Sequence, residues 1–352
     1  MADQAKYTNK LKDKRVLVIG GSSGIGYGVA EACLENGSIV TISSSNQSRI
    51  DQTIAKLQAA YPSAQSRITG HACNLGDQST LETNLEQLLK TVATDHKLDH
   101  IVFTAADPLA VMKVADLTLP KLISAGLIRF FAPLLLAKHA PTYLNPGPSS
   151  SITLTTGSVS ERPRPDWSAI GAFATGLQGM ARGLALDLKP IRVNVVSPGA
   201  VDTELWRGMT QEAKGEMFKA IGEKVPTGRV GRVEDVAEAF LYLMLDGNVT
   251  GSMVAGELLA IGRVVTDASA GYRAHLNHSV FSRRQGWPPR LARLEIRHIR
   301  IPQGPVWVSG VESYQPAAPG GTSDDLAEAK DIAPSGIVSA GAEEALNNLL
   351  RH

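Results

Sequence analysis

The chain has 352 residues, of which 43% are hydrophobic and 20% charged, a composition typical of a globular protein with ample material for a core. Its formal net charge of +1 gives no electrostatic reason to expect nucleic acid or an anionic membrane as a partner. No uninterrupted apolar run approaches the roughly 18 residues of a membrane-spanning helix. The first residues, MADQAKYTNKLKDKR, lack the apolar core of a signal peptide. The only cysteines, Cys33 and Cys73, have no ligand-like spacing, so we expect a cytoplasmic protein without a metal site.

From about Lys14 onward, short apolar runs alternate with stretches of helical period. Strands are predicted at 15–20, 38–44, 66–75, 98–106, 150–157 and 191–199, and helices at 24–37, 48–61, 81–95, 117–143, 168–188 and 233–245. Continuously apolar strands that alternate with helices indicate a parallel sheet covered on both faces. The predicted fold class is therefore α/β, a doubly wound Rossmann sheet of the dinucleotide-binding type.

The regular alternation stops near Arg263, which predicts two parts of different character. Residues 11–264 are assigned to one nucleotide-binding domain that includes the substrate pocket. Residues 265–352 form a C-terminal extension that mixes Arg, Pro, Gly and Trp without a sustained period, so we expect irregular or disordered chain with a short helix at 340–350. The Arg- and Trp-rich stretch leaves open a binding role, although a non-native extension is the favoured interpretation.

The stretch VLVIGGSSGIG places three glycines where the first predicted strand meets the first helix. Glycines there permit a tight turn and let main-chain amides approach a pyrophosphate at the helix N-terminus. The alternative is an ordinary glycine-rich turn, but the position at the head of a long alternating series favours cofactor binding. The predicted phosphate-binding residues are Gly20, Ser22, Ser23, Gly24, Ile25 and Gly26.

The second strand ends in TISSSNQSR, where an NAD-binding protein usually has an acidic residue for the ribose 2′-hydroxyl. Because no carboxylate is present and Arg49 lies within reach, the sequence favours a 2′-phosphate and hence NADP(H). The alternative is that Arg49 is a solvated residue of the first helical turn. The predicted contacts at the adenosine end are Ser44, Ser45, Asn46 and Arg49, with Asn74 and Leu75 flanking the adenine.

The motifs GGSSGIG, CNL, VFTAAD, RVNVVSPGAVDT and GRVEDVAEAFLYLM occur in this order within residues 11–262 and resemble the short-chain dehydrogenase/reductase family. The resemblance implies a small-molecule substrate and a homodimer or homotetramer in which the helices at 117–143 and 168–188 pair between subunits. It also implies a nicotinamide-binding loop and a ribose-facing strand end, which here are Pro198, Gly199, Val201 and Thr203, and Ala105 and Ala106.

The catalytic positions of that family are altered here. Its asparagine, serine, tyrosine and lysine positions fall on Arg129, Gly157, Ile170 and Ala174, with Ser158 beside Gly157. The segment 144–188 contains neither tyrosine nor lysine. The resemblance therefore implies cofactor binding without the usual proton donor.

The sequences PDWS and MARGLALDLKPIRVNVVSPGAV resemble a fungal subgroup that includes the reductase/Diels–Alderases of the malbrancheamide and paraherquamide pathways. That resemblance implies NADP dependence, a role in secondary metabolite biosynthesis, and an Asp and an Arg in the substrate pocket, here Asp166 and Arg129. The small residues of AIGAFATG indicate room for a large polycyclic substrate.

Hydride addition to a ketone generates an alkoxide that must be protonated, whereas addition to an iminium ion gives a neutral amine. A pocket without a tyrosine therefore favours a pre-activated, iminium-like substrate, attracted by Asp166 and stacked on Trp167. A cyclisation in the same pocket would need positioning but no proton donor. The predicted catalytic residues are Asp166, Arg129, Ser158 and Trp167.

Each candidate has a structural alternative. Asp166 is a good helix N-cap, Trp167 can be a packing residue, and Arg129 can bind the nicotinamide ribose or face a subunit neighbour. Two competing functions remain open: an ordinary carbonyl reductase that uses Ser158 with Arg129 or Asp166, and an inactive NADP-binding scaffold.

Overall fold

The computed structural model describes residues 6–256, 296–300 and 307–311, and the chain divides into two units, residues 1–265 and 266–352. In the second unit, the described residues form a two-stranded antiparallel sheet of β8 (Ile296–Arg300) and β9 (Trp307–Val311). The sequence patterns did not predict these two strands. The helix expected at 340–350 lies outside the described residues.

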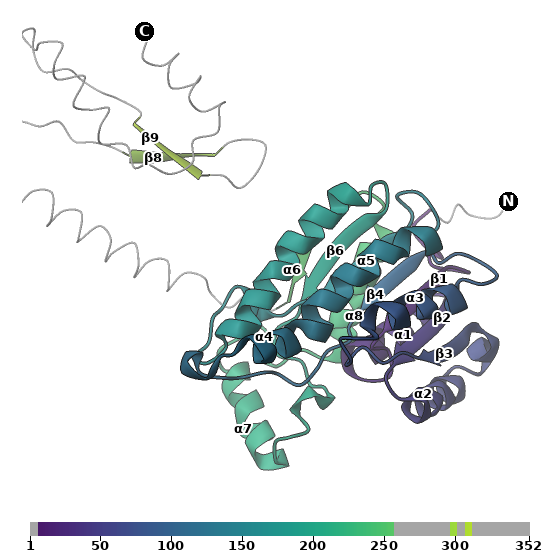
Figure 1. The fold of residues 1–352 in the computed structure, drawn as a ribbon, viewed down its shortest axis with the longest axis horizontal. Helices are drawn as coiled ribbons and strands as arrows, with labels where there is room; N and C mark the ends of the chain where they lie inside the picture. The colour runs from purple at the N-terminus through teal and green to yellow at the C-terminus, as the bar shows by residue number, and fades with distance from the viewer. Residues whose placement is uncertain (1–5, 257–295, 301–306, 312–352) are drawn as a thin grey trace, which may run out of the picture. The chain divides into compact units, whose positions relative to one another are not determined.

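The first unit is built on a seven-stranded sheet in which neighbouring strands are parallel (Figure 1). The strands are β1 (Arg15–Ile19), β2 (Ile39–Ser44), β3 (Ile68–Ala72), β4 (His100–Phe103), β5 (Ser151–Thr155), β6 (Arg192–Ser197) and β7 (Met253–Ala255). Their order, β3-β2-β1-β4-β5-β6-β7, reverses between β1 and β4. This confirms the predicted doubly wound fold, in which ligands bind at the carboxyl ends of the strands beside such a reversal.

Helices cover both faces of the sheet (Figure 1). They are α1 (Gly24–Glu35), α2 (Gln47–Ala60), α3 (Leu81–Val92), α4 (Leu119–Gly126), α5 (Ala132–Tyr143), α6 (Ser168–Asp187), α7 (Gln211–Gly222) and α8 (Val233–Leu245). Two buried clusters fill the layers, and β1 contributes to both, with Leu17 and Ile19 packing on the α3, α5 and α6 side and Val16 and Val18 on the α1, α2 and α8 side. Burial on both faces explains why the strands are continuously apolar.

The helical region expected over 117–143 is divided into α4, a π-helical turn at Leu127–Phe131, and α5. Among the described residues, the stretch Leu119–Tyr143 alone has the length and mean hydropathy, 1.6, of a membrane-crossing helix. That is weak evidence for a membrane, because the core helices of globular proteins satisfy the same criteria. Part of the stretch is such a helix, since α5 buries Ala132, Leu136 and Ala140 in the core.

Candidate active site

A cavity of about 910 Å³ lies at the carboxyl ends of the sheet strands. Nearly all of the cofactor-binding residues expected from the sequence line it: Gly20, Ser22, Ser23, Gly24, Ile25, Gly26, Ser44, Ser45, Arg49, Asn74, Leu75, Ala105, Ala106, Arg129, Pro198, Gly199, Val201 and Thr203. Of the remaining candidates, Ser158 and Trp167 also line the cavity, whereas Asn46 and Asp166 do not. These residues come from segments throughout the first unit, and the fold brings them together around one cavity.

The glycine turn between β1 and α1 is shaped to receive an anion. Gly24 has a φ of +52°, a conformation that side chains other than glycine rarely adopt. A Cβ at Gly26 would overlap the carbonyl oxygen of Gly20, so only glycine lets the turn close. The N-cap residue Ser23 makes no side-chain capping hydrogen bond, and the first-turn amides of α1 therefore remain available to a phosphate. These features fit a dinucleotide cofactor.

The adenosine end of the cavity is fixed by contacts at the start of α2. The Asn46 Oδ1 atom accepts a hydrogen bond from the amide of Arg49 at 2.9 Å, so Asn46 is the N-cap of α2. The Thr53 hydroxyl lies 3.1 Å from the carbonyl oxygen of Ser22 and 2.8 Å from that of Arg49, which ties α2 to the glycine turn. The Arg49 side chain is exposed at the cavity edge.

The loop after β6, which the family resemblance predicts to bind the nicotinamide, is held by main-chain bonds and by one tryptophan. The amide of Ser158 donates to the carbonyl oxygen of Pro198 at 2.9 Å, which joins this loop to the segment after β5. Trp206 Nε1 donates to the carbonyl oxygen of Val201 at 2.8 Å. The loop therefore has a defined conformation from Pro198 to Trp206.

The wall that α6 contributes to the cavity is apolar. Ile170, Phe173, Ala174 and Leu177 line it at the spacing of one helical face. Ile170 and Ala174, in the positions where the family resemblance implies tyrosine and lysine, are 7% and 8% exposed. The described part of α6 therefore presents no proton donor to the cavity.

The nearby threonine hydroxyls are already engaged. Thr155 Oγ1 donates to the carbonyl oxygen of Phe103 at 2.8 Å, and Thr156 Oγ1 donates to that of Ala174 at 2.7 Å. A hydroxyl has one proton to donate, so neither threonine can give a hydrogen bond to a substrate without losing its present one.

The charged groups of the inner cavity are Asp107 and Arg129. The guanidinium of Arg129, projected by the π-helical turn, donates from Nη2 to the main-chain carbonyl of Asp107. Burial raises the pKa of the Asp107 carboxyl, an effect that the positive charge of Arg129 partly offsets. Burial likewise lowers the pKa of Arg129, and Asp107 counters it. Arg129 remains charged because an arginine pKa starts far above neutrality. No pattern in the sequence indicated that Asp107 would line the cavity.

Asp166 lies outside the cavity, contrary to the expectation from the family resemblance. Its side chain is exposed, its φ is +64°, and its carbonyl oxygen accepts a hydrogen bond from the amide of Met112 at 3.0 Å. The alternative that Asp166 caps α6 is also not what the structure shows, because the N-cap residue is Trp167. Asp166 thus lies in the exposed turn before α6 and is not among the residues that line the cavity.

Trp167 lines the cavity with a guanidinium stacked on its ring. The Arg164 Cζ atom lies 5.2 Å from the ring centroid, and both residues face the cavity. The sequence patterns indicated Trp167 but not Arg164. The turn before α6 brings Arg164 to the cavity. The result is a flat, partly polar surface at the substrate end.

Taken together, the glycine turn, the sheet reversal and the nicotinamide loop define a Rossmann-type protein that binds a nicotinamide cofactor. The model of the SDR-like Rossmann domain matches residues 7–259. The chain is 48% identical over 256 residues to the short-chain dehydrogenase/reductase fsr5 of Gibberella fujikuroi, which covers 72% of this chain and 97% of that relative. It is 42% identical over 264 residues to the short-chain dehydrogenase/reductase malC of Malbranchea aurantiaca, covering 74% of this chain and 100% of malC.

Solved structures show the same likeness. The MalC reductase/Diels–Alderase from Malbranchea aurantiaca matches with a TM-score of 0.67 at 42% identity, covering 70% of this chain and 96% of that one. A small-chain dehydrogenase in complex with NADPH matches with a TM-score of 0.57 at 26% identity, covering 70% and 97%. This chain belongs to the short-chain dehydrogenase/reductase family, a family of oxidoreductases.

Proposed function

We propose that this protein catalyses NADPH-dependent hydride transfer to a small molecule that enters the cavity already activated, as an iminium ion or a similar cation. The α6 wall is the observation that carries this proposal, because Ile170 and Ala174 present only apolar surface where the family has its proton donor. Reduction of a ketone needs that donor, whereas reduction of an iminium ion does not. The geometry therefore favours the second substrate class.

Asp107 and Arg129 are the groups that we assign to the substrate end, with Asp107 in the role that the family resemblance implied for Asp166. As a carboxylate in a partly buried cavity, Asp107 attracts a cationic carbon more strongly than an exposed group would. Arg129 holds the main chain of Asp107 in place through its hydrogen bond. Trp167 offers a flat surface for a polycyclic substrate and Ser158 a hydroxyl.

Coenzyme selection follows from the charges at the adenosine end. When bound, the reduced nicotinamide supplies the hydride. The Gly20–Gly26 turn would hold the pyrophosphate, and the loop from Pro198 to Thr203 the nicotinamide. Arg49 lies at the cavity edge, and the end of β2 provides Ser44 and Ser45 instead of a carboxylate. These residues support a preference for NADP(H) over NAD(H).

The relatives support a role in fungal secondary metabolism, since they include a reductase/Diels–Alderase. A cavity of about 910 Å³ has room for a large substrate next to a cofactor and thus for a guided cyclisation. We further propose a cytoplasmic homodimer or homotetramer. Its interface would cover the exposed leucines of α4, α5 and α6, namely Leu119, Leu134 and Leu186.

The test compares substrates on one purified protein. Panels of cyclic imines and of matched ketones are incubated with NADPH, following coenzyme oxidation and the stereochemistry of the product. Turnover of imines but not ketones supports the proposal. Efficient ketone turnover contradicts it, and tight NADPH binding without turnover of any plausible intermediate supports an inactive scaffold.

A carbonyl reductase is the second candidate, and the raised pKa of Asp107 favours it. A carboxyl that stays protonated at higher pH can donate a proton to a developing alkoxide. In that case Asp107 replaces the tyrosine, and ketone reduction declines as the pH rises through its pKa. The pH profile therefore separates the two candidates.

A further inference from the structure

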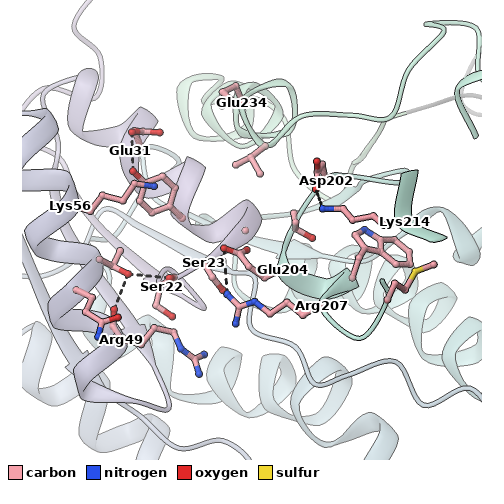
Figure 2. Close-up of a pocket in the computed structure, with 18 of the residues that line it drawn as sticks. Ser22, Ser23, Glu31, Arg49, Lys56, Asp202, Glu204, Arg207, Lys214 and Glu234 are labelled. Carbon is pink, nitrogen blue, oxygen red and sulfur yellow. Dashed lines mark hydrogen bonds and ion pairs between the residues drawn. The ribbon is translucent and has the colours of Figure 1, made fainter. Parts of the chain in front are cut away.

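A second cavity of about 820 Å³ lies on the outer side of the glycine turn, between α1, α2 and the segment 202–214 (Figure 2). It shares a border with the first cavity: Ser22, Ser23, Gly24, Arg49, Thr203, Glu204, Trp206 and Arg207 line both. A group bound at the adenosine end of the coenzyme site would therefore lie next to these shared residues. The sequence predicted Ser22, Ser23, Gly24, Arg49 and Thr203 as cofactor-binding residues, but it did not indicate Glu204, Trp206 or Arg207.

Several charged side chains of the second cavity have partners within the part of the chain that the structure describes. Lys214 Nζ lies 2.6 Å from Asp202 Oδ1, and the Tyr27 hydroxyl donates to Glu31 Oε1 at 3.1 Å. By contrast, no described acidic side chain lies within 4.0 Å of the Arg49 guanidinium. The border between the cavities thus contains an arginine with no described carboxylate partner.

Arg207 is the second arginine of the border, and its pairing is weak. Its Nη2 atom lies 3.6 Å from Glu204 Oε1, and the two side chains are 65% and 42% exposed. An exposed ion pair at that distance adds little stability. Figure 2 shows Arg207 extending from the segment after β6 toward Ser23, with Arg49 on the α2 side of the same turn. Arg207 can therefore leave Glu204 for another anionic partner with little loss of stability.

The segment that carries Arg207 lies close to the glycine turn. A Cβ built on Gly24 would lie 3.4 Å from Glu204 Oε2 and 3.3 Å from the Cβ of Thr203. Trp206, between the two charged residues, is anchored by its hydrogen bond to the carbonyl oxygen of Val201. The main chain on the N-terminal side of Arg207 is thus held beside the glycine turn.

We propose that Arg207 is a second cationic ligand for the 2′-phosphate of NADP(H), facing Arg49 across Ser22 and Ser23. This inference rests on the proposed preference for NADP(H). A phosphate carries more negative charge than the Glu204 carboxylate and matches the planar guanidinium through two hydrogen bonds, so it displaces Glu204 as the partner of Arg207. Binding of the 2′-phosphate would then also tie the segment after β6 to the glycine turn.

The experiment measures dissociation constants for NADPH, NADH and adenosine 2′,5′-bisphosphate on the purified full chain, by calorimetry and nucleotide fluorescence. The variants are Arg207→Ala, Arg49→Ala and the control Lys219→Ala, which removes an exposed cation of α7 that lines neither cavity. We expect Arg207→Ala to weaken NADPH and the bisphosphate by about tenfold or more and NADH by less than about twofold. Lys219→Ala should change none of the three.

Two results overturn the role of Arg207: equal weakening of NADPH and NADH, which would place it on the pyrophosphate, or no change for either. Glu204→Gln gives an independent measurement, because removing the competing carboxylate should tighten NADPH by a few fold without affecting NADH. If the unaltered protein binds NADH as tightly as NADPH, the proposed coenzyme preference itself is wrong. That outcome is distinct from a failure of Arg207 alone.

Discussion

The two ends of the main cavity differ in the chemistry of the residues that line them. At the coenzyme end, the glycine turn, the adenosine-side serines and the loop after β6 keep the arrangement of the family, and their geometry fits a dinucleotide. At the substrate end, the α6 face that lines the cavity is apolar, and charge comes from Asp107 in the segment after β4 and from Arg129 in the π-helical turn. The described residues thus combine a turn suited to a dinucleotide with an α6 face that presents no proton donor to the cavity.

The coenzyme end should tolerate the least change. In Gly26→Ala, the new methyl would overlap the main-chain oxygen of Gly20 and the hydroxyl of Thr104, neither of which can move without opening the turn. We expect loss of measurable NADPH binding and destabilisation by about 1–3 kcal/mol, measured by calorimetry and thermal denaturation.

Gly215→Ala is the matched control, because a Cβ at Gly215 in α7 meets nothing within 4 Å. It should keep NADPH affinity and stabilise the protein by up to about 1 kcal/mol, since alanine is the better helix former. Normal NADPH binding by Gly26→Ala would show that the turn is not the phosphate site.

The substrate end should gain ketone reduction when a proton donor is introduced on α6. The double variant Ile170→Tyr with Ala174→Lys restores a proton donor on the α6 face that lines the cavity. General acid catalysis contributes about 10²–10⁴-fold, so we expect ketone reduction to rise by at least about 100-fold in initial-rate assays. Imine reduction should change far less.

Each single variant serves as a control, because tyrosine without lysine should recover only part of the gain. Unchanged ketone turnover, in a double variant that still binds NADPH, would argue that the missing dyad is not what limits this cavity.

The coenzyme end could be predicted from sequence because its determinants are local. The glycine turn lies within seven consecutive residues, Gly20–Gly26, and the strands are recognisable by continuous apolar runs that result from burial on both faces. The fold class follows from the same alternation. Short-range patterns of this kind fix backbone geometry directly.

The substrate end could be predicted only in part, because its groups meet through tertiary structure. Asp107 and Arg129 are 22 positions apart, and the contact depends on a π-helical turn that no sequence pattern signalled. Asp166 was expected in the pocket, but it is exposed in a turn whose main chain bonds to Met112, and it does not line the cavity. Arg207 depends on how the segment after β6 meets the glycine turn.

The two aspartates provide a matched pair for the proposed electrostatic role. Asp107→Asn removes a negative charge from the cavity, whereas Asp166→Asn removes one from the exposed turn before α6. We expect Asp107→Asn to lower kcat/KM for cationic imines by about 10- to 100-fold, in line with an interaction of a few kcal/mol in a partly buried site. Asp166→Asn should stay within about twofold.

Both variants should bind NADPH normally, which the same titration checks. The reverse order of effects would return the site carboxylate to Asp166 and contradict the placement seen in the structure.

The smallest expected effect concerns pH. Because burial raises the pKa of Asp107 above its ordinary value of about 3.9, the carboxyl ionises at a higher pH than a free aspartate. If its carboxylate attracts a cationic substrate, kcat/KM for a substrate that stays charged rises by a few fold as the pH increases through that pKa. If its protonated form donates to a ketone, kcat/KM falls over the same interval. A pH profile with a permanently charged N-alkyl iminium substrate tests the first role, and a parallel profile with a ketone tests the second. In Asp107→Asn either slope should disappear, since no group remains at that position to titrate.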